Sequence, residues 1–275
     1  MQRFGARLRA AVAAAGPVCV GIDPHPELLT GWGLSDDVAG LARFSETVAE
    51  AVAGRVAAVK PQSAFYERFG SQGVAVLEST IRQLQTAGVL VVLDVKRGDI
   101  GSTAAAYAAA YLADGAPMAV DAITASPYLG VGSLRPMIDL AVRSGRGVFV
   151  LARTSNPEGA VIQRSTTASG RSVAQWVVDE ISQVNAGVDP LGDVGVVVGA
   201  TVGSMDIDLM DLNGPVLVPG LGAQGGRPAD LPGVLGSHRS AVLASYSREI
   251  LRAGPTVSGL RDALERVTAE CVAVL

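Results

Sequence analysis

The sequence predicts a (β/α)8 barrel, and three observations lead to that fold. Short runs rich in β-branched residues recur eight times along the chain. Amphipathic stretches rich in Ala and Leu separate most of these runs. The chain has 275 residues, close to the size of about 250 that is typical of one such barrel. Because alternating strands and helices indicate a parallel sheet, and eight such units at this length favour closure, we expect one α/β domain over residues 1–275.

The eight candidate strands have continuous hydrophobic centres, as expected for parallel strands that are buried on both faces. In chain order they are Val18–Asp23, Val56–Pro61, Val89–Lys96, Ala119–Ser126, Gly147–Thr154, Val194–Ala200, Pro215–Gly222 and Ser240–Ser247. A barrel enzyme holds its catalytic groups at the carboxyl ends of such strands, so polar residues at these ends are the candidates for chemistry.

The amphipathic segments between the runs predict helices. The first begins after the capping residues Ser35–Asp37 and ends near Ala53, and the segment after Pro215–Gly222 has only a weak helical pattern. The others are expected at Val74–Ala87, Thr103–Asp114, Ser133–Arg143, Arg171–Val184, Met205–Leu212 and Val257–Val272. The irregular stretches Pro24–Leu34 and Ser155–Ser169 are predicted to be loops at strand ends, where loops often cover an active site.

Composition excludes several classes of protein. The formal net charge is −4, like charges form no run, and aromatic residues make up 4% of the chain, so no nucleic-acid partner is expected. The apolar runs are too short to span a membrane, and the amino-terminal residues lack the apolar core of a signal peptide. Cys19 and Cys271 lie near opposite ends of the chain and are expected to be reduced, buried thiols. We therefore expect a cytoplasmic protein.

Polar residues follow nearly every predicted strand. Any one of them has a simple explanation, because charged residues end strands. The pair Asp94 and Lys96 is more informative, since residues two apart in a strand point to the same face, where unpaired charges are costly. These two side chains are expected to neutralise each other at the mouth of the barrel, with Asp99 adding a second carboxylate.

The segment Leu93–Thr103, LDVKRGDIGST, contains a D-x-K-x-x-D pattern at the end of the third predicted strand. The pattern resembles the signature of the orotidine 5'-phosphate decarboxylase family. Further similar segments are VGID, VKPQ, TASPYLG and SYSREI, and PGLGAQGG at Pro219–Gly226 resembles the phosphate loop of the bacterial subgroup that includes mycobacterial-type enzymes. The resemblance extends from Val18 to about Ile250, nearly the whole chain.

The resemblance implies a role for each matching residue. Lys60, Asp94, Lys96 and Asp99 would form an alternating catalytic array. Substrate would be bound by Asp23 and Gln62 at the ribose, by Ser126 at the pyrimidine ring, and by Gly220, Gly222, Gln224 and Arg248 at the phosphate. The chain departs from the family pattern at two points: Gln62 stands where many relatives have Asn, and SYSREI replaces the commoner G-R-x-I around Arg248.

The implied reaction converts orotidine 5'-phosphate into uridine 5'-phosphate and CO2 in pyrimidine biosynthesis. It leaves a carbanion at C6 that no π system delocalises, so electrostatic stabilisation and proton delivery must lower the barrier. Lys96 is the expected proton donor, and Asp94 would lie against the substrate carboxylate. The family uses no metal and no organic cofactor, and neither His25 nor His238 is expected to be a metal ligand or a catalytic base.

The resemblance also implies a homodimer with shared active sites, in which Asp99, Ile100 and Thr103 reach into the neighbouring subunit's site. Two alternatives remain open at this point. Metal-dependent 3-keto-L-gulonate 6-phosphate decarboxylases and hexulose-phosphate synthases share a similar element and use it with Mg²⁺. The second alternative is a non-catalytic nucleotide-binding barrel. Buried charges are costly to a fold, and a protein without catalysis has no reason to retain them.

Overall fold

The computed structural model describes residues 2–202, 206–238 and 241–275. Its eight parallel strands close into one barrel in the order in which they follow along the chain. They are β1 Val18–Ile22, β2 Ala58–Pro61, β3 Leu90–Arg97, β4 Ala122–Ala125, β5 Gly147–Arg153, β6 Val194–Val198, β7 Val216–Val218 and β8 Val242–Tyr246. Every strand lies at an expected position, which confirms the (β/α)8 barrel. Ser240, the first residue expected in the last strand, lies outside the described residues.

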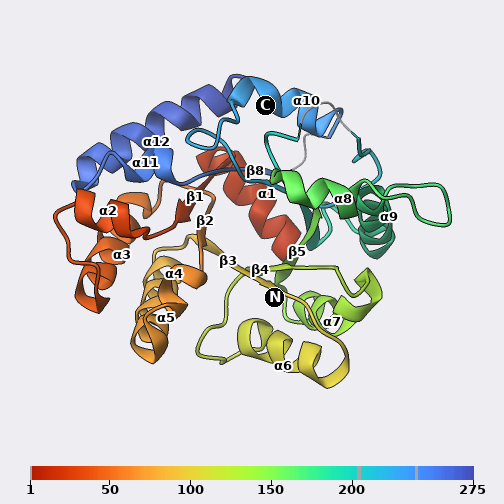
Figure 1. The fold of residues 1–275 in the computed structure, drawn as a ribbon, viewed down its shortest axis with the longest axis horizontal. Helices are drawn as coiled ribbons and strands as arrows, with labels where there is room; N and C mark the ends of the chain where they lie inside the picture. Colours follow the sequence, from red (N-terminus) through yellow and green to blue (C-terminus); the bar gives the residue numbers. More distant parts are fainter. Residues whose placement is uncertain (1, 203–205, 239–240) are drawn as a thin grey trace.

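Helices surround the strands in a ring (Figure 1). Those described are α1 Phe4–Ala15, α2 Pro26–Gly31, α3 Val38–Val52, α4 Ala64–Glu67, α5 Gly70–Thr86, α6 Gly101–Leu112, α7 Arg135–Arg143, α8 Ala160–Gln163, α9 Val173–Asn185, α10 Leu231–Leu235, α11 Arg248–Leu251 and α12 Val257–Val272. The expected bounds of α12 are confirmed, and α3, α5, α6, α7 and α9 begin and end within four residues of the expected positions. Asp37 caps α3, with its Oδ1 accepting from the amide of Gly40 at 2.8 Å.

The helix expected at Met205–Leu212 is wrong. Met205 lies outside the described residues, and residues 206–212 form turns and bends. The carboxylate of Asp208 accepts a hydrogen bond from the amide of Met210 at 2.9 Å, and its own amide donates to the Gln175 side chain at 2.6 Å. Such side-chain bonds give the backbone an alternative to a helix.

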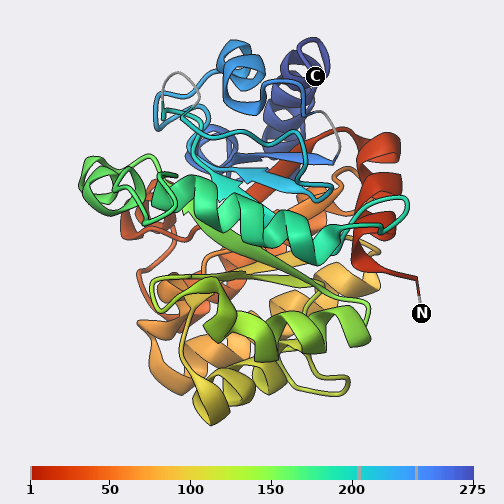
Figure 2. The same cartoon turned by 90° about the vertical axis from the view of Figure 1, so that its right-hand side faces the viewer.

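Both stretches that were expected to be loops contain helix. Within Pro24–Leu34 the structure has α2, which begins at a proline, a residue whose fixed φ suits the first helical turn. Within Ser155–Ser169 it has a 3-10 turn, Pro157–Gly159, followed by α8. In Figure 2 this segment projects from the side of the barrel opposite α1.

The first helix closes the amino-terminal end of the barrel. Phe4 and Leu8 of α1 are fully buried against the inward-facing side chains of the strands, including Phe149 at an edge-to-face ring distance of 6.0 Å. Figure 1 shows α1 inside the ring of the other helices. Because this end is plugged, only the carboxyl ends of the strands offer an open mouth. None of the described helices is long and apolar enough to cross a membrane.

Candidate active site

Asp94 is the centre of a buried charged cluster at the carboxyl end of β3. Its Oδ2 accepts from Lys60 Nζ and Gln62 Nε2, each at 3.0 Å. Its Oδ1 accepts from Lys96 Nζ at 2.6 Å and from the hydroxyl of Thr124 at 2.8 Å. Four donors on one carboxylate satisfy a buried charge that would otherwise be costly. The expectation that Asp94 and Lys96 neutralise each other is confirmed.

The two lysines of the cluster differ in exposure. The side chain of Lys60 is 8% exposed and that of Lys96 is 47% exposed. Lys60 therefore acts as an internal counter-charge, while Lys96 is held by Asp94 at one side and open to the mouth at the other. A cation in this position can meet a ligand without first breaking its ion pair.

The charges of the cluster reinforce one another. Burial disfavours a charged Asp94, but Lys60 and Lys96 more than offset burial and hold its pKa well below the usual range. Burial likewise disfavours a charged Lys60, yet the carboxylates of Asp94 and Asp23 raise its pKa above the usual value. The aspartate and Lys60 are therefore both ionised at neutral pH.

The backbone at Lys96 is strained. Its φ is +43°, in the left-handed region that non-glycine residues rarely adopt, and the pairing of β3 with β4 is irregular between Leu93 and Arg97. The amide of Lys96 donates to Thr124 Oγ1 at 2.9 Å, which helps to hold this conformation. Such strain costs on the order of 1 kcal/mol and is most often found at functional sites.

Asp23 and Gln62 extend the cluster across the mouth. Asp23 Oδ1 lies 4.0 Å from Lys60 Nζ. This oxygen is buried, and within the described part of the chain no hydrogen bond reaches it. Gln62 donates to Asp94 and pairs with it as an isolated bridge between β2 and β3. An unsatisfied carboxylate oxygen beside a lysine offers an acceptor to a ligand hydroxyl.

Glycine backbone shapes the loop after β7. Gly220 and Gly222 have φ values of +99° and +69°, so a side chain at either position would be strained. The amides of Gly222 and Gly226 donate back into the loop, at 2.8 Å and 3.0 Å, and so are not available to a ligand. A Cβ atom on Gly220 would lie 3.4 Å from Gln224 Oε1, so the Gln224 side chain folds over this turn.

Arg248 follows β8, the strand next to β7 in the barrel. It lies one residue beyond Ser247, whose hydroxyl is buried and has no hydrogen-bond partner among the described residues. A Cβ atom on Gly21 would lie 2.8 Å from Ser247 Cβ and 3.4 Å from Asp23 Oδ2. Ser247 and Asp23 therefore face each other across the ends of β8 and β1.

Comparison with known proteins identifies the family of the chain. Residues 16–263 match the family model described as orotidine 5'-phosphate decarboxylase / HUMPS family. The chain belongs to this family. A relative from Salinispora arenicola named orotidine 5'-phosphate decarboxylase is 67% identical over all of this chain and 99% of its own length. One of the same name from Streptomyces coelicolor is 57% identical over 98% of this chain and 97% of its own.

A solved structure extends the comparison to three dimensions. The crystal structure of a Streptomyces avermitilis protein, titled for orotidine 5'-phosphate decarboxylase, superposes with a TM-score of 0.96. It is 57% identical, and the match covers 100% of this chain and 96% of that one. The family resemblance predicted from D-x-K-x-x-D is thus confirmed.

Asp99 of the family array and the expected substrate residue Thr103 do not join the cluster within one chain. Asp99 accepts a hydrogen bond from the neighbouring amide of Ile100 at 2.7 Å and makes no ion pair in the described part of the structure. Thr103 is exposed on the first turn of α6. Ile100, between them, is 63% exposed.

Ser126 lies at the rim of the mouth rather than beside the charged cluster. Its amide donates to the carbonyl of Arg97 at 2.8 Å, and it lines an apolar cavity of about 730 Å³ beneath α8. Ser155, which the sequence analysis did not single out, has its hydroxyl 3.8 Å from the position of a Cβ on Gly220. Ser155 follows the polar end of β5 in the sequence, and this position could have marked it as a candidate site residue.

Thr124 is the other residue that the sequence analysis missed. It is 1% exposed and bonds both to the Asp94 side chain and to the Lys96 backbone. Its position in an apolar strand, ITAS, gave no sign of this double contact.

Among the described residues, no three His, Cys, Asp or Glu side chains gather closely enough to hold a metal ion.

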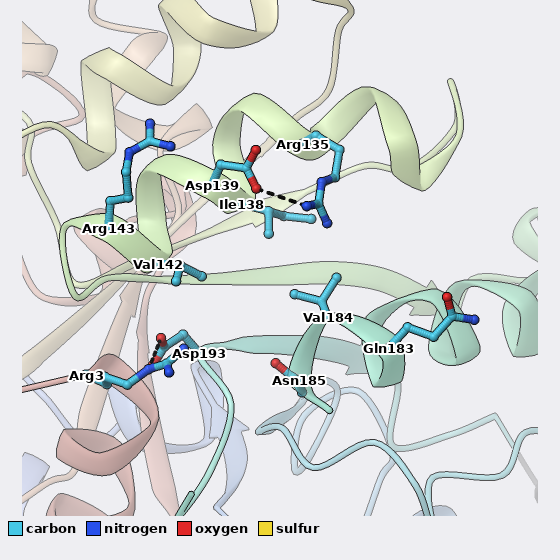
Figure 3. Close-up of a pocket in the computed structure, with 10 residues that line it drawn as sticks. All are labelled: Arg3, Arg135, Ile138, Asp139, Val142, Arg143, Gln183, Val184, Asn185 and Asp193. Carbon is cyan, nitrogen blue, oxygen red and sulfur yellow. Dashed lines mark hydrogen bonds and ion pairs between the residues drawn. The ribbon is translucent and has the colours of Figure 1, made fainter. Parts of the chain in front are cut away.

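A separate cavity of about 410 Å³ lies between α7 and α9 at the amino-terminal end of the barrel (Figure 3). Arg3 pairs with Asp193 at 2.8 Å, and Arg135 pairs with Asp139 at 3.3 Å. Arg143, which also lines the cavity, makes no ion pair within the described residues. The cavity is remote from the mouth, where the family holds its catalytic residues.

Proposed function

We propose that this chain is an orotidine 5'-phosphate decarboxylase, which converts orotidine 5'-phosphate into uridine 5'-phosphate and CO2 in pyrimidine biosynthesis. The observation that carries this proposal is the Lys60–Asp94–Lys96 cluster at the carboxyl end of the barrel strands, with Lys96 exposed to the mouth. The names of the full-length relatives from Salinispora and Streptomyces support the same activity.

Lys96 is the proposed catalytic acid. The loss of CO2 leaves an electron pair on C6 of the ring, and the ammonium of Lys96 stabilises this charge and then donates the proton that forms the new C–H bond. Asp94 holds Lys96 in place through their ion pair. Asp94 and Lys60 are both charged before substrate binds, so the charges of the site are already in position. Asp94 also lies beside the substrate carboxylate and repels it, and the loss of CO2 relieves this repulsion. This repulsion lowers the barrier less than the stabilisation of the negative charge at C6 does.

The remaining site residues are proposed to hold the substrate. The free Oδ1 of Asp23 suits a ribose hydroxyl, with Gln62 beside it. Ser126 is kept as the ring contact. The phosphate is assigned to Gln224 and Arg248 and to the turn that Gly220 and Gly222 shape through their positive φ, since the Gly222 amide is already bonded within the loop. Phosphate binding far from the reacting bond positions the ring and so lowers the barrier indirectly.

The proposal includes a homodimer with shared active sites. Among the described residues, Asp99 makes no ion pair with its own cluster and Thr103 is exposed, as expected of a segment that serves a partner. Ile100, Tyr128 and Leu129 beside this segment are 63%, 77% and 53% exposed. Large exposed apolar side chains grouped on adjacent loops are typical of a protein interface.

Three further points complete the proposal. All 275 residues are assigned to one domain, because strands from residues 18–22 to residues 242–246 share a single barrel. No cofactor is assigned. The location is cytoplasmic, in line with two buried cysteines that are both free thiols.

The test is the loss of orotidine 5'-phosphate absorbance on adding purified protein, with EDTA present. We expect full activity in the chelator and uridine 5'-phosphate as the product. The family description also covers HUMPS proteins, so activity that disappears with EDTA and returns with Mg²⁺ would indicate the metal-dependent alternative instead. A well-folded protein that binds uridine 5'-phosphate without turning over substrate would indicate a non-catalytic barrel.

A further inference from the structure

A basic cavity lies beside Arg248, between α11 and α2. Its volume is about 330 Å³, and its lining comprises His25, Glu27, Leu28, Gly31, Trp32, Arg248 and Arg252. The indole N–H of Trp32, a buried residue, donates to the carbonyl of Leu251 at 2.9 Å. This bond fixes α2 against α11, so the walls of the cavity are built into the fold.

Two arginines face this cavity without a partner. Arg248 and Arg252 lie one helical turn apart, because the amide of Arg252 donates to the carbonyl of Arg248 at 3.1 Å. Across the described ranges, neither guanidinium makes an ion pair or a hydrogen bond. The one lining carboxylate, Glu27, is exposed at the first turn of α2. The cavity therefore carries a net positive charge.

Most other arginines in the described part of the chain pair with a carboxylate. In the cavity of Figure 3, Arg3 and Arg135 are paired with aspartates, and only Arg143 of its lining arginines makes no ion pair among the described residues. Next to α11, Arg266 pairs with Glu249 at 3.4 Å. Two unpaired guanidinium groups on one cavity wall therefore stand out, and the planar fork of arginine favours phosphate oxygens as partners.

The order of the strands places this cavity near the proposed phosphate site. Strands β7, β8 and β1 are consecutive around the barrel. The glycine loop follows β7, Arg248 follows β8, and α2 follows β1. Arg248 is therefore shared: it is assigned to the proposed phosphate site, and it lines this cavity together with Arg252. A ligand that extends past the first phosphate toward Arg252 enters the basic cavity.

We propose that the cavity formed by His25, Arg248 and Arg252 binds the second phosphate of a nucleoside diphosphate whose first phosphate occupies the substrate phosphate site. The inference rests on the proposed function, which places a nucleotide phosphate at Arg248. Uridine 5'-diphosphate then competes with orotidine 5'-phosphate and binds more tightly than uridine 5'-phosphate, since it adds charge-assisted hydrogen bonds to Arg252.

The experiment is calorimetric titration of the whole protein with each nucleotide, in EDTA. Wild type should bind uridine 5'-diphosphate about tenfold more tightly than uridine 5'-phosphate, the effect of one good charge-assisted contact. Arg252→Ala should reduce this ratio to about one, and Glu27→Gln should increase it by removing the only lining carboxylate. Arg9→Ala is the matched control: it removes the same charge from exposed surface on α1, at the opposite end of the barrel, and should leave the ratio unchanged.

Failure of the second-phosphate site and failure of the decarboxylase function give different results. Equal affinity for the two nucleotides in wild type, or a ratio that Arg252→Ala leaves intact, overturns the second-phosphate site while turnover of orotidine 5'-phosphate stands. Failure of both nucleotides to bind, with no turnover, overturns the proposed function instead. Inorganic pyrophosphate is titrated separately, and binding as tight as that of the diphosphate would show a site for free polyphosphate rather than for a nucleotide.

Discussion

Thr124 donates its hydroxyl hydrogen to Asp94 Oδ1 at 2.8 Å and, through the same oxygen, accepts the backbone amide of Lys96 at 2.9 Å. One buried side chain thus ties the carboxylate to the backbone of the lysine that it neutralises. Because Lys96 sits at a φ of +43°, this contact helps to aim its side chain at Asp94 and the mouth. Thr124 is therefore a positioning residue in the proposed mechanism.

Thr124→Val should lower kcat by about tenfold or more, because it removes a hydrogen bond to a charged group and frees the Lys96 amide. KM for orotidine 5'-phosphate should change little, since Thr124 contacts protein groups in the cluster. Steady-state kinetics measure both constants. Thr124→Ser keeps the hydroxyl and should recover most of the lost kcat. If the serine variant is as slow as the valine variant, the hydroxyl has no positioning role.

Gln224→Ala and Arg248→Ala should mainly weaken the binding of phosphorylated ligands. Each removes a proposed phosphate contact, and a charge-assisted hydrogen bond is worth about 1.5–3 kcal/mol. Comparing kcat/KM for orotidine 5'-phosphate and for orotidine, which lacks the phosphate, measures the effect. The loss should be confined to the phosphorylated substrate. An equal loss on both substrates would place the phosphate elsewhere.

Acid should weaken the charged cluster in a defined range of pH. Burial opposes ionisation of Asp94, but Lys60 and Lys96 hold its pKa below the ordinary 3.8. A carboxylate with a depressed pKa stabilises the fold above its unfolded pKa, and this contribution is lost as pH falls through the folded pKa. Asp94→Asn should therefore cost roughly 3 kcal/mol of unfolding free energy near neutral pH.

The stability difference between wild type and Asp94→Asn should stay constant down to about pH 5 and shrink below pH 3.8. Urea unfolding at several pH values measures it. Glu46→Gln is the matched control, since Glu46 makes an exposed ion pair with Arg43 at 3.8 Å; its effect should stay below about 1 kcal/mol. A difference that narrows already at neutral pH would contradict the assigned pKa direction.

Complementation tests the shared active sites. Lys96→Ala and Asp99→Ala proteins should each be nearly inactive alone. After mixing, unfolding and refolding together, half the dimers should be mixed, and each mixed dimer should have one site with an intact Lys96 and the partner's intact Asp99. Activity should return to about a quarter of wild type by random pairing. If mixed dimers form and remain inactive, Asp99 serves its own subunit.

The barrel and the centre of the site could be predicted from the sequence because both depend on local patterns. Eight apolar runs separated by amphipathic stretches specify strand and helix positions, and all eight strands are found there. The spacing of Asp94 and Lys96 specifies that they share a face, and their 2.6 Å contact agrees. The capping position of Asp37 before α3 was equally local.

Features that depend on distant contacts were not predicted. The helix expected at Met205–Leu212 is replaced by turns because Asp208 bonds to Met210 and to Gln175, which lies far away in the sequence. No helix was expected at the amino terminus, and the packing of Phe4 and Leu8 of α1 into the end of the barrel follows only from the closed fold. The double contact of Thr124 likewise needed the strand register of β3 and β4.

The most direct test of the central claim is the turnover of orotidine 5'-phosphate by Lys96→Ala, measured with EDTA present alongside wild type. The account predicts that the variant still binds uridine 5'-phosphate but is slower by about a thousandfold or more, because it lacks the proposed proton donor at C6. A variant that folds, binds and turns over substrate within about tenfold of the wild-type rate would contradict the account, because Lys96 would then not be the group that protonates the ring.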